Sequence, residues 1–303
     1  RQQSAQLAAK DVHLFQPRTA VRGLNQAAFD YWLKSDADKV TLEILDSNGQ
    51  LIRSFAGSAD DEKRKSGAAA DDEESFAPPV RLPGRKAGTN RFTWDLRYPG
   101  ATVFEGMILW SARAESGPLA VPGNYQVRLT ANGKTETQVF SIKKDPRLTT
   151  ATEADLAEQF KLAIQVRDKT TEANQAVIRI RDLKKQIKDR SDKAKQQSIT
   201  DAGNAVARKL SEVEEEIYQV RNRSGQDPLN FPIKLNNQIA ALRRSIESGD
   251  GKPTAQSYVV FKELSERLDV QLRRLDEIVK TDLAKLNQLL SENKLEAVAI
   301  GKK

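Results

Sequence analysis

The chain contains no cysteine and a single histidine, His13, and each shortage removes a class of function. Without cysteine there is no disulfide, no thiolate nucleophile and no Cys-ligated zinc or iron–sulfur site. One histidine cannot build a two- or three-histidine metal site, and a Ser-His-Asp triad would have to use His13 itself. We therefore expect no metal and no cofactor, and we expect His13 to lie on a mobile N-terminal lead-in.

Long apolar runs are missing as well. No stretch approaches the ~20 consecutive apolar residues that a helix needs to cross a bilayer, so we expect no membrane insertion. No charged-then-apolar leader opens the chain, which begins at Arg1 and has one methionine, Met107. We expect a processed protein, or a piece of a longer one.

Charge of either sign is abundant but is not gathered in one place. The 303 residues include 49 Lys and Arg against 42 Asp and Glu, a net charge of +7, and the excess is spread over both halves. A nucleic-acid-binding protein usually concentrates its basic residues in a patch or stripe, so we expect no nucleic-acid partner. The length predicts about two domains.

The first domain is predicted over residues 26–147, after a lead-in of residues 1–25. Short runs of alternating apolar residues, such as AAFDYWL and KVTLEILD, are typical of half-buried strands. Two Asn-Gly pairs, at 48–49 and 132–133, separate such runs and predict hairpins. About seven strands follow, with GMILW (106–110) as one short apolar run, and they predict an Ig-like or fibronectin-like β-sandwich.

Residues 56–79 do not fit that sandwich. They are small, charged and almost free of large apolar side chains, which predicts a mobile acidic insertion. Their acidic clusters could attract Ca²⁺ weakly, but they lack the spacing and the central glycine of a calcium loop. A solvated charged run is the preferred interpretation.

The second domain is predicted over residues 148–303 as an elongated antiparallel helical bundle, with three long helices and one short. Apolar residues recur every three or four positions over 153–190, 197–222, 235–246 and 254–291. Thr150 with Glu153, and Thr152 with Asp155, resemble capping boxes at the start of the first predicted helix. In the last predicted helix the apolar residues are spaced in an eleven-residue repeat, which predicts a nearly straight helix.

Candidate sites are few. Asp95 and Glu105 flank LRYPGATVF and could act together as a glycosidic acid and base. An enzyme could otherwise use Asp95, Glu105 or His13 as catalysts. The alternative is that Trp94 fills the core while Asp95 accepts N–H bonds in the turn that follows it. We favour the second interpretation and predict no catalytic, cofactor-binding or metal-binding residue.

Aromatic and charged side chains offer two further readings. Tyr31, Trp32, Tyr98 and Trp110 could stack on a sugar ring, although alternation places Tyr31 and Trp32 on opposite faces. The run Glu214–Glu216 and the basic pairs are read as ordinary bundle surface, with a groove for a partner helix as the alternative. The pairs are Lys184-Lys185, Arg243-Arg244 and Arg273-Arg274.

Two resemblances rest on ordered motifs. GTNRFTWD (88–95) and PGNYQVRL (122–129) resemble the Ig-like domain of flagellar hook-capping proteins over about residues 29–142. That family implies a core Trp94 and a final hairpin opened by Pro122-Gly123-x-Tyr125. The chain departs from it by the acidic insertion and by the extra residues between the two motifs.

The extra residues carry the second resemblance. FTWDLRYPG, FEGMILW, GPLAVPGNYQVRL and KKDPR, followed by the first helix, resemble the C-terminal region of exported bacterial sortilin-like, BNR-repeat β-propeller proteins. The similarity spans about residues 13–290. Many such proteins bear a glycosyl hydrolase label, but their propeller lies N-terminal and would carry the sugar chemistry. This chain shows no propeller repeat, so that activity transfers to none of its residues.

We therefore expect a non-catalytic accessory or assembly module from an exported protein, located in the periplasm, on the cell surface or outside the cell. The expected partner is a protein, either the chain's own propeller or an envelope complex. The alternative is a module that binds carbohydrate or accompanies a glycoside hydrolase. An enzyme could also use a cleft shared with a missing propeller. A docking role predicts an exposed apolar patch, whereas sugar binding predicts two or more exposed aromatics on one sandwich face.

Overall fold

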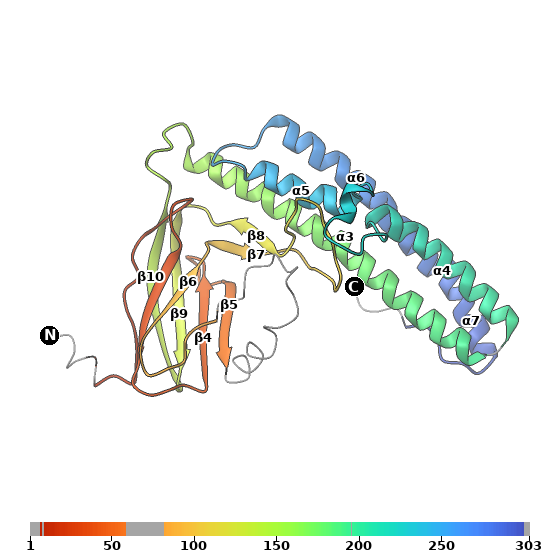
Figure 1. Ribbon diagram of the computed structural model, residues 1–303, viewed down its shortest axis with the longest axis horizontal. Helices are drawn as coiled ribbons and strands as arrows, with labels where there is room; N and C mark the ends of the chain where they lie inside the picture. The colour runs from red at the N-terminus through yellow and green to blue at the C-terminus, as the bar shows by residue number, and fades with distance from the viewer. Residues whose placement is uncertain (1–6, 8, 59–81, 195, 300–303) are drawn as a thin grey trace. The chain divides into compact units, whose positions relative to one another are not determined.

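The computed structural model describes residue 7 and residues 9–58, 82–194 and 196–299. These residues form two compact units. We call the first the strand unit; it comprises Arg1–Pro99, Pro118–Phe160 and Asp250–Lys252. The second, the helical unit, comprises Gly100–Gly117, Lys161–Gly249 and Pro253–Lys303. An all-β part thus precedes an all-α part along most of the chain (Figure 1).

The units differ in detail from the predicted domains. Residues 100–117, which we placed in the sandwich, cluster with the helices instead, and the first turns of the first long helix cluster with the strands. The expected lead-in, residues 1–25, contains two strands that pair with others. The expected acidic insertion, 56–79, begins inside a strand that continues to Ser58, and the rest of it lies outside the described residues.

The strand unit contains a three-stranded and a five-stranded sheet, in the orders β1-β3-β6 and β2-β10-β9-β4-β5. A separate two-stranded sheet pairs β7 with β8. The strands are β1 (Val12–Leu14), β2 (Ala20–Val21), β3 (Ala27–Leu33), β4 (Lys39–Leu45), β5 (Leu51–Ser58), β6 (Gly88–Trp94), β7 (Arg97–Pro99), β8 (Ser116–Leu119), β9 (Gly123–Ala131) and β10 (Lys134–Lys143).

One apolar core fills the space between the two larger sheets, because alternate residues of each strand point to the same side. Along β3 the burial pattern alternates strictly, and Phe29, Tyr31 and Leu33 face the core as predicted. Phe140 lies at the centre of an aromatic cluster, 5.1 Å from the ring of Phe29 and 6.3 Å from that of Trp94. This packing makes the strand unit a two-layer sandwich.

Both predicted hairpins are confirmed. β4 pairs with β5 across the Asn48-Gly49 loop, and β9 pairs with β10 across Asn132-Gly133. Gly49, Asn132 and Gly133 have positive φ angles of 80°, 49° and 72°. Glycine and asparagine tolerate this region best, which is why the two dipeptides mark the turns in the sequence.

The helical unit is built from α4 (Gln197–Ile217), α5 (Leu235–Ile246), α6 (Ala255–Ile278), α7 (Ala284–Glu292) and most of α3 (Glu153–Ala194). Ion pairs define the directions of the long helices. Arg181 and Lys184 of α3 both contact Glu214 of α4, and Lys209 of α4 contacts Asp282 after α6. None of the described helices is long and apolar enough to span a bilayer.

The antiparallel order follows from these and two further pairs. Lys169 and Arg179 of α3 contact Asp269 and Asp276 of α6, so α3 and α6 run in the same direction. Along α3 from Arg181 to Lys184, the partner on α4 moves back from Glu214 to Ser211. Helices α3 and α4 therefore run in opposite directions. The chain therefore goes up, down and up again, as the predicted bundle requires. With α6, a π-turn and α7 counted as one helix, the region has four helices.

Three helix predictions were wrong in detail. The first helix continues to Ala194, past the predicted residue 190. The second helix ends at Ile217, before the predicted residue 222, because Tyr218 adopts an extended backbone with φ −132° and ψ 144°. The last helix is interrupted by a π-turn at Val279–Leu283. A π-turn inserts one extra residue, so the excess over 3.6 residues per turn is taken up at one point. Val279 and Leu283 remain buried.

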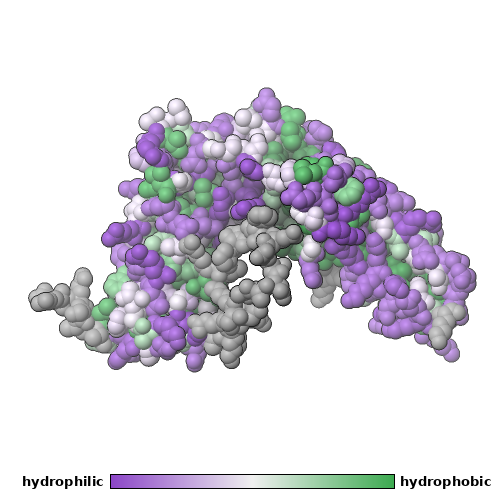
Figure 2. All heavy atoms as spheres, in the orientation of Figure 1, coloured by the Kyte–Doolittle hydropathy of each residue, from purple (hydrophilic) through white to green (hydrophobic). Residues whose placement is uncertain are grey.

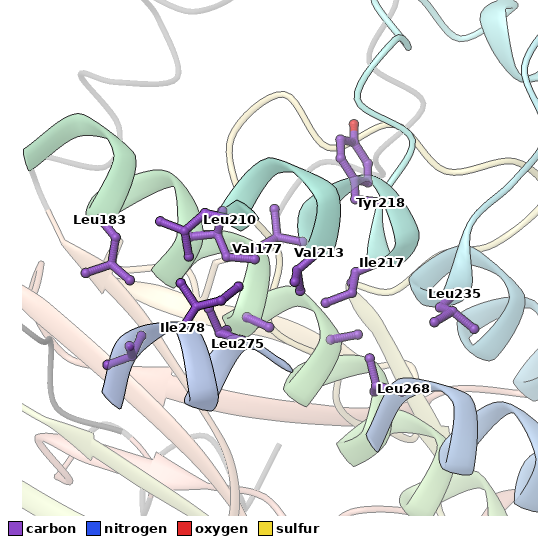
Figure 3. Close-up of a cluster of buried hydrophobic side chains, with 14 of the residues drawn as sticks. Val177, Leu183, Leu210, Val213, Ile217, Tyr218, Leu235, Leu268, Leu275 and Ile278 are labelled. Carbon is purple, nitrogen blue, oxygen red and sulfur yellow. The ribbon is translucent and has the colours of Figure 1, made fainter. Parts of the chain in front are cut away.

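The apolar stripes of these helices meet in a single core. Figure 3 shows side chains from α3, α4, α5 and α6 pointing toward one another. The labelled residues are Val177, Leu183, Leu210, Val213, Ile217, Tyr218, Leu235, Leu268, Leu275 and Ile278. All are buried. At roughly 25 cal/mol per Å² of apolar area removed from water, such burial is the main stabilising contribution to the bundle.

Helix α3 begins with one of the two predicted capping boxes. The Thr152 N–H donates to Asp155 Oδ2 at 2.9 Å, and the Asp155 N–H donates to Thr152 Oγ1 at 3.1 Å. The Thr152 hydroxyl also donates to Asp155 Oδ2 at 2.6 Å. That hydroxyl bond first, and the N–H bond second, hold the pKa of Asp155 below its ordinary value.

A pH dependence follows from this cap. Since the pKa of Asp155 is lower in the folded than in the unfolded chain, its contribution is fully present above the unfolded pKa, about 3.9. It is lost as the pH falls through the folded pKa. The stability difference between wild type and Asp155→Asn, measured by urea unfolding, should therefore shrink as the pH falls below about 4. Glu153→Gln is the control, and a difference independent of pH would contradict the prediction.

Candidate functional site

The residues proposed for catalysis have structural partners. His13 lies on β1, not on a loose lead-in, with Nδ1 3.0 Å from Lys10 Nζ and 3.2 Å from Glu136 Oε2. Glu136 Oε2 also accepts the N–H of Leu14 at 2.7 Å. This carboxylate therefore secures β1 beside β10. Glu105 is exposed and belongs to the helical unit.

Trp94 and Asp95 adopt the structural alternative. Trp94 is 1% exposed, and its Nε1 donates to the carbonyl of Arg97 at 3.0 Å. Asp95 Oδ1 accepts the N–H of Arg97 at 3.1 Å and lies 3.6 Å from Arg53 Nη1. Leu96, between Asp95 and Arg97, takes a positive φ of 60°. The motif is a turn that follows a core strand, as the sequence suggested.

The aromatic candidates separate by burial. Tyr31 is buried, its hydroxyl donates to the carbonyl of Gly84 at 2.6 Å, and burial raises its pKa above the ordinary value. Trp32, on the opposite face, is half-buried. Tyr98 packs edge-on against Phe160, with 4.8 Å between ring centroids. Among the described residues of the sandwich no aromatic side chain is exposed, whereas Trp110 of the helical unit is 41% exposed.

Two of the charged motifs are not ordinary surface. Glu214 is buried and receives Arg181 Nε at 2.8 Å and Lys184 Nζ at 3.1 Å. Arg243 is also buried and donates to three acceptors: Glu247 Oε2 and the carbonyls of Gly117 and Arg113. The helical period alone does not reveal this, because most of these partners lie on other elements; Glu247, one turn from Arg243, is the exception. Among the described side chains, no group of three or more could hold a metal ion.

Residues 100–117 form a segment of the helical unit that is irregular up to the start of β8 at Ser116. The sequence analysis counted GMILW as a strand of the sandwich, but it has no strand conformation and lies in this irregular segment. The neck of the segment is closed by the Ala101 N–H, which donates to the carbonyl of Ala114 at 2.7 Å. Gly100 is required there, because a Cβ would lie 2.2 Å from the Glu115 carbonyl oxygen.

Helix side chains hold the backbone of this segment at several points. Thr171 Oγ1 accepts the N–H of Thr102 at 3.2 Å, and Asn174 Nδ2 donates to the Thr102 carbonyl at 2.7 Å. Asn237 binds Trp110 through both amide atoms: Oδ1 accepts its N–H at 2.6 Å, and Nδ2 donates to its carbonyl at 2.9 Å. The irregular backbone thereby satisfies its polar groups without a strand or helix of its own.

The middle of the segment folds around Tyr218. Phe104 packs edge-on against the Tyr218 ring, with 5.0 Å between centroids, and the Arg181 guanidinium lies 4.7 Å from the Phe104 centroid. The Tyr218 hydroxyl accepts the Ile108 N–H at 3.1 Å and donates to the Gly106 carbonyl at 3.3 Å. The extended backbone that ends α4 early places this hydroxyl at the segment.

This anchoring presents apolar side chains to solvent. We call residues 103–110, VFEGMILW, the apolar loop. Val103 is 46% and Trp110 41% exposed, and the side chains of Met107, Ile108 and Leu109 are half-buried. On the face drawn in Figure 2, areas of hydrophobic residues lie among hydrophilic ones. A fixed backbone that carries two exposed apolar side chains, with half-buried ones between them, is suited to contact with another macromolecule.

Basic residues border one end of the loop. Arg244 donates to Ser111 Oγ at 2.6 Å, and the side chain of Arg113 is exposed. Tryptophan, methionine and arginine are enriched at protein interfaces, whereas glutamate is depleted there. The loop and its border combine these favoured residue types, with Glu105 as the exception.

Comparison with known proteins places the chain in no family. No family model matches it, and no curated protein matches it either. Solved structures with a detectable likeness include CopC from Methylosinus trichosporium OB3b, at 12% identity, covering 45% of this chain and 98% of that one, with a TM-score of 0.24.

Two others are the periplasmic chaperone SfaE and a human IgV-like domain. SfaE is 10% identical, with 48% of this chain and 62% of SfaE covered and a TM-score of 0.21. The human B7-H4 IgV-like domain is 9% identical, with coverages of 44% and 95% and a TM-score of 0.19. At these scores the likenesses support no conclusion about function.

Proposed function

We propose that this chain is a non-catalytic docking module, and that the apolar loop is the surface through which it binds a protein partner. The observation that carries the proposal is the combination of a fixed backbone and exposed apolar side chains. Asn237 and Tyr218 fix the main chain of Trp110, Ile108 and Gly106, so little conformational entropy is lost on binding.

The partner is proposed to be a folded protein with an apolar pocket rimmed by carboxylates. A tryptophan that projects from a fixed loop is a typical interface anchor, since it buries a large area at low entropic cost. Arg113 and Arg244 at the border of the loop complement acidic groups around such a pocket. The chain's own propeller or an envelope complex, suggested by the resemblance to exported propeller proteins, is our proposed source of this surface.

The same resemblance supports the other parts of the proposal. It suggests an Ig-like assignment for the sandwich and an exported location for the protein. Trp94, placed in the core of the sandwich, agrees with the role that the family implies for it. The catalytic alternative has less support, because Asp95 and His13 are both engaged by neighbouring side chains.

A crosslinking and affinity experiment tests the docking proposal. A photo-crosslinking residue placed at position 103 or 110 should capture one protein, whereas the same residue at Val259, which is 64% exposed on α6, should not. Binding of the captured, purified protein should weaken at least tenfold in Trp110→Ala, as for a truncated interface anchor. Val259→Ala is the matched control.

Two results would overturn this proposal. One is an unchanged affinity in Trp110→Ala, and the other is equal crosslinking from positions 110 and 259. Carbohydrate binding remains the second candidate because Trp110 is exposed enough to stack on a sugar ring. It predicts a change in Trp110 fluorescence on titration with oligosaccharides, absent in Trp110→Phe, and no protein crosslink from position 110.

A further inference from the structure

The chain turns back on itself after α7. The Leu295 N–H donates to the Leu290 carbonyl at 2.9 Å, and the Lys294 N–H to the Ser291 carbonyl at 3.0 Å. Lys294 takes a positive φ of 58°, a conformation that glycine usually supplies at the end of a helix. We call residues 295–299, LEAVA, the clasped segment.

Two side-chain amides hold the backbone of the clasped segment. Asn287 of α7 binds Val298: Oδ1 accepts its N–H at 2.8 Å, and Nδ2 donates to its carbonyl at 3.1 Å. Gln186 of α3 binds Ala299 in the same manner, at 2.8 and 3.2 Å. An amide is the neutral side chain that can pair with both the N–H and the C=O of one residue. The main chains of the consecutive residues Val298 and Ala299 are thus bound by side-chain amides, much as peptide-binding proteins bind the main chain of their ligands.

Side-chain contacts add sequence selectivity. Arg190 of α3 donates through Nη2 to Glu296 Oε2 at 2.7 Å, and through Nε to the Glu296 carbonyl at 3.1 Å. Val298 is 2% exposed and belongs to the core of the helical unit. Ala297 and Ala299 are exposed and present only methyl groups. The acceptor surface, formed by Gln186, Arg190 and Asn287, therefore selects a Glu-x-Val sequence.

We propose that this acceptor surface is a peptide-binding site, and that its occupant in trans is the clasped segment of a second copy of the chain, which enters by exchange. Main-chain recognition is identical whether the segment comes from the same chain or from another. The connection is short, since Asn293 and Lys294 alone separate α7 from the segment. An extended connection would release the positive φ of Lys294, and a short, strained hinge favours exchange.

Peptide binding can be measured on the full chain. Val298→Asp places a carboxylate in the core position, so the variant's own segment leaves the acceptor surface. A fluorescent peptide with the sequence NKLEAVA, residues 293–299, should bind this variant at least tenfold more tightly than it binds wild type, whose own segment competes. Adding Gln186→Ala or Asn287→Ala should weaken binding at least tenfold, and a peptide with Asp in place of Val should not bind.

Circular dichroism distinguishes loss of the site from loss of the fold. The Val298→Asp variant should keep the helical signal of wild type. If it is folded and the NKLEAVA peptide does not bind, the acceptor surface is not a peptide site. Binding that is indifferent to both amide substitutions overturns the proposal equally.

Exchange has its own test in the association state of the chain. Lys294→Pro excludes a positive φ and removes the N–H that closes the turn, so it should favour an open hinge and a dimer. Lys294→Gly removes the strain and should favour the closed monomer. Light scattering after size exclusion should give a dimer dissociation constant at least tenfold lower for Lys294→Pro than for wild type. Adding Val298→Asp to the Lys294→Pro variant should restore the monomer. If the Lys294→Pro variant is monomeric, exchange between copies is ruled out. If that monomeric variant still binds the NKLEAVA peptide, the occupant of the acceptor surface would be a Glu-x-Val segment of another protein.

Discussion

Replacing Trp94 by alanine should lower the free energy of unfolding of the strand unit by about 3–5 kcal/mol, the usual cost of removing a large aromatic side chain from a core. The indole is 1% exposed and lies 6.1 Å from the Tyr125 ring and 6.3 Å from the Phe140 ring, measured between centroids. Its loss would leave a cavity between two sheets that are held apart by the other core side chains, so the structure can close the cavity only in part. Urea unfolding followed by near-UV circular dichroism measures the change.

Trp110→Ala is the control for this substitution. It removes the same side chain from a position that is 41% exposed, so we expect a loss below about 1 kcal/mol. Equal losses for the two variants would mean that Trp94 is not a core residue. That result would revive the idea that the Trp-Asp motif is a binding site.

Replacing Arg22 by methionine should have an effect of similar size in the same unit. Arg22 is 1% exposed and donates from Nε to Asp250 Oδ1 at 2.9 Å, and from Nη1 to the carbonyls of Leu119 and Ala120 at 2.9 and 2.7 Å. Nη2 donates to Gln159 Oε1 at 2.5 Å. Removing one partner of a buried ion pair leaves the other charge, here that of Asp250, uncompensated, which costs about 3–5 kcal/mol.

The control for Arg22 is an exposed arginine in an equally well-formed pair. Arg91 binds both oxygens of Asp30, at 2.6 and 2.9 Å, but its side chain is 67% exposed. Arg91→Met should therefore cost less than about 1 kcal/mol, because water replaces the lost bonds. A loss below 1 kcal/mol for Arg22→Met would show that the buried network contributes no more than a surface pair.

Elements set by local rules were predictable from the sequence. Strand β3 was read correctly because its alternation of apolar residues is strict, and the Asn-Gly pairs located two hairpins because their residues tolerate positive φ. Helix α5 was expected over the residues that form it, 235–246, since its apolar period continues to its last residue. The Thr152–Asp155 cap was visible for the same reason: both partners lie within one turn.

Features that depend on distant partners were not predictable. Asn237 and Trp110 are 127 residues apart, and nothing in GMILW indicates that an asparagine will bind its backbone. The run was taken for a strand because it is short and apolar, although it lacks the alternation of β3. Arg22 gave no signal either, since its acceptors come from positions about 97 to 228 residues away.

Three amides, Asn237, Asn287 and Gln186, hold loops of the helical unit by their main chains alone. Such contacts are indifferent to which side chains the loops carry. The course of the loop and its binding preference can therefore change independently: substitutions at the exposed positions 103 and 110 can change the partner while the backbone of the loop is preserved. Because side-chain amides of the helices fix the loop backbones, exposed loop side chains can change and bind new partners while the helices stay the same.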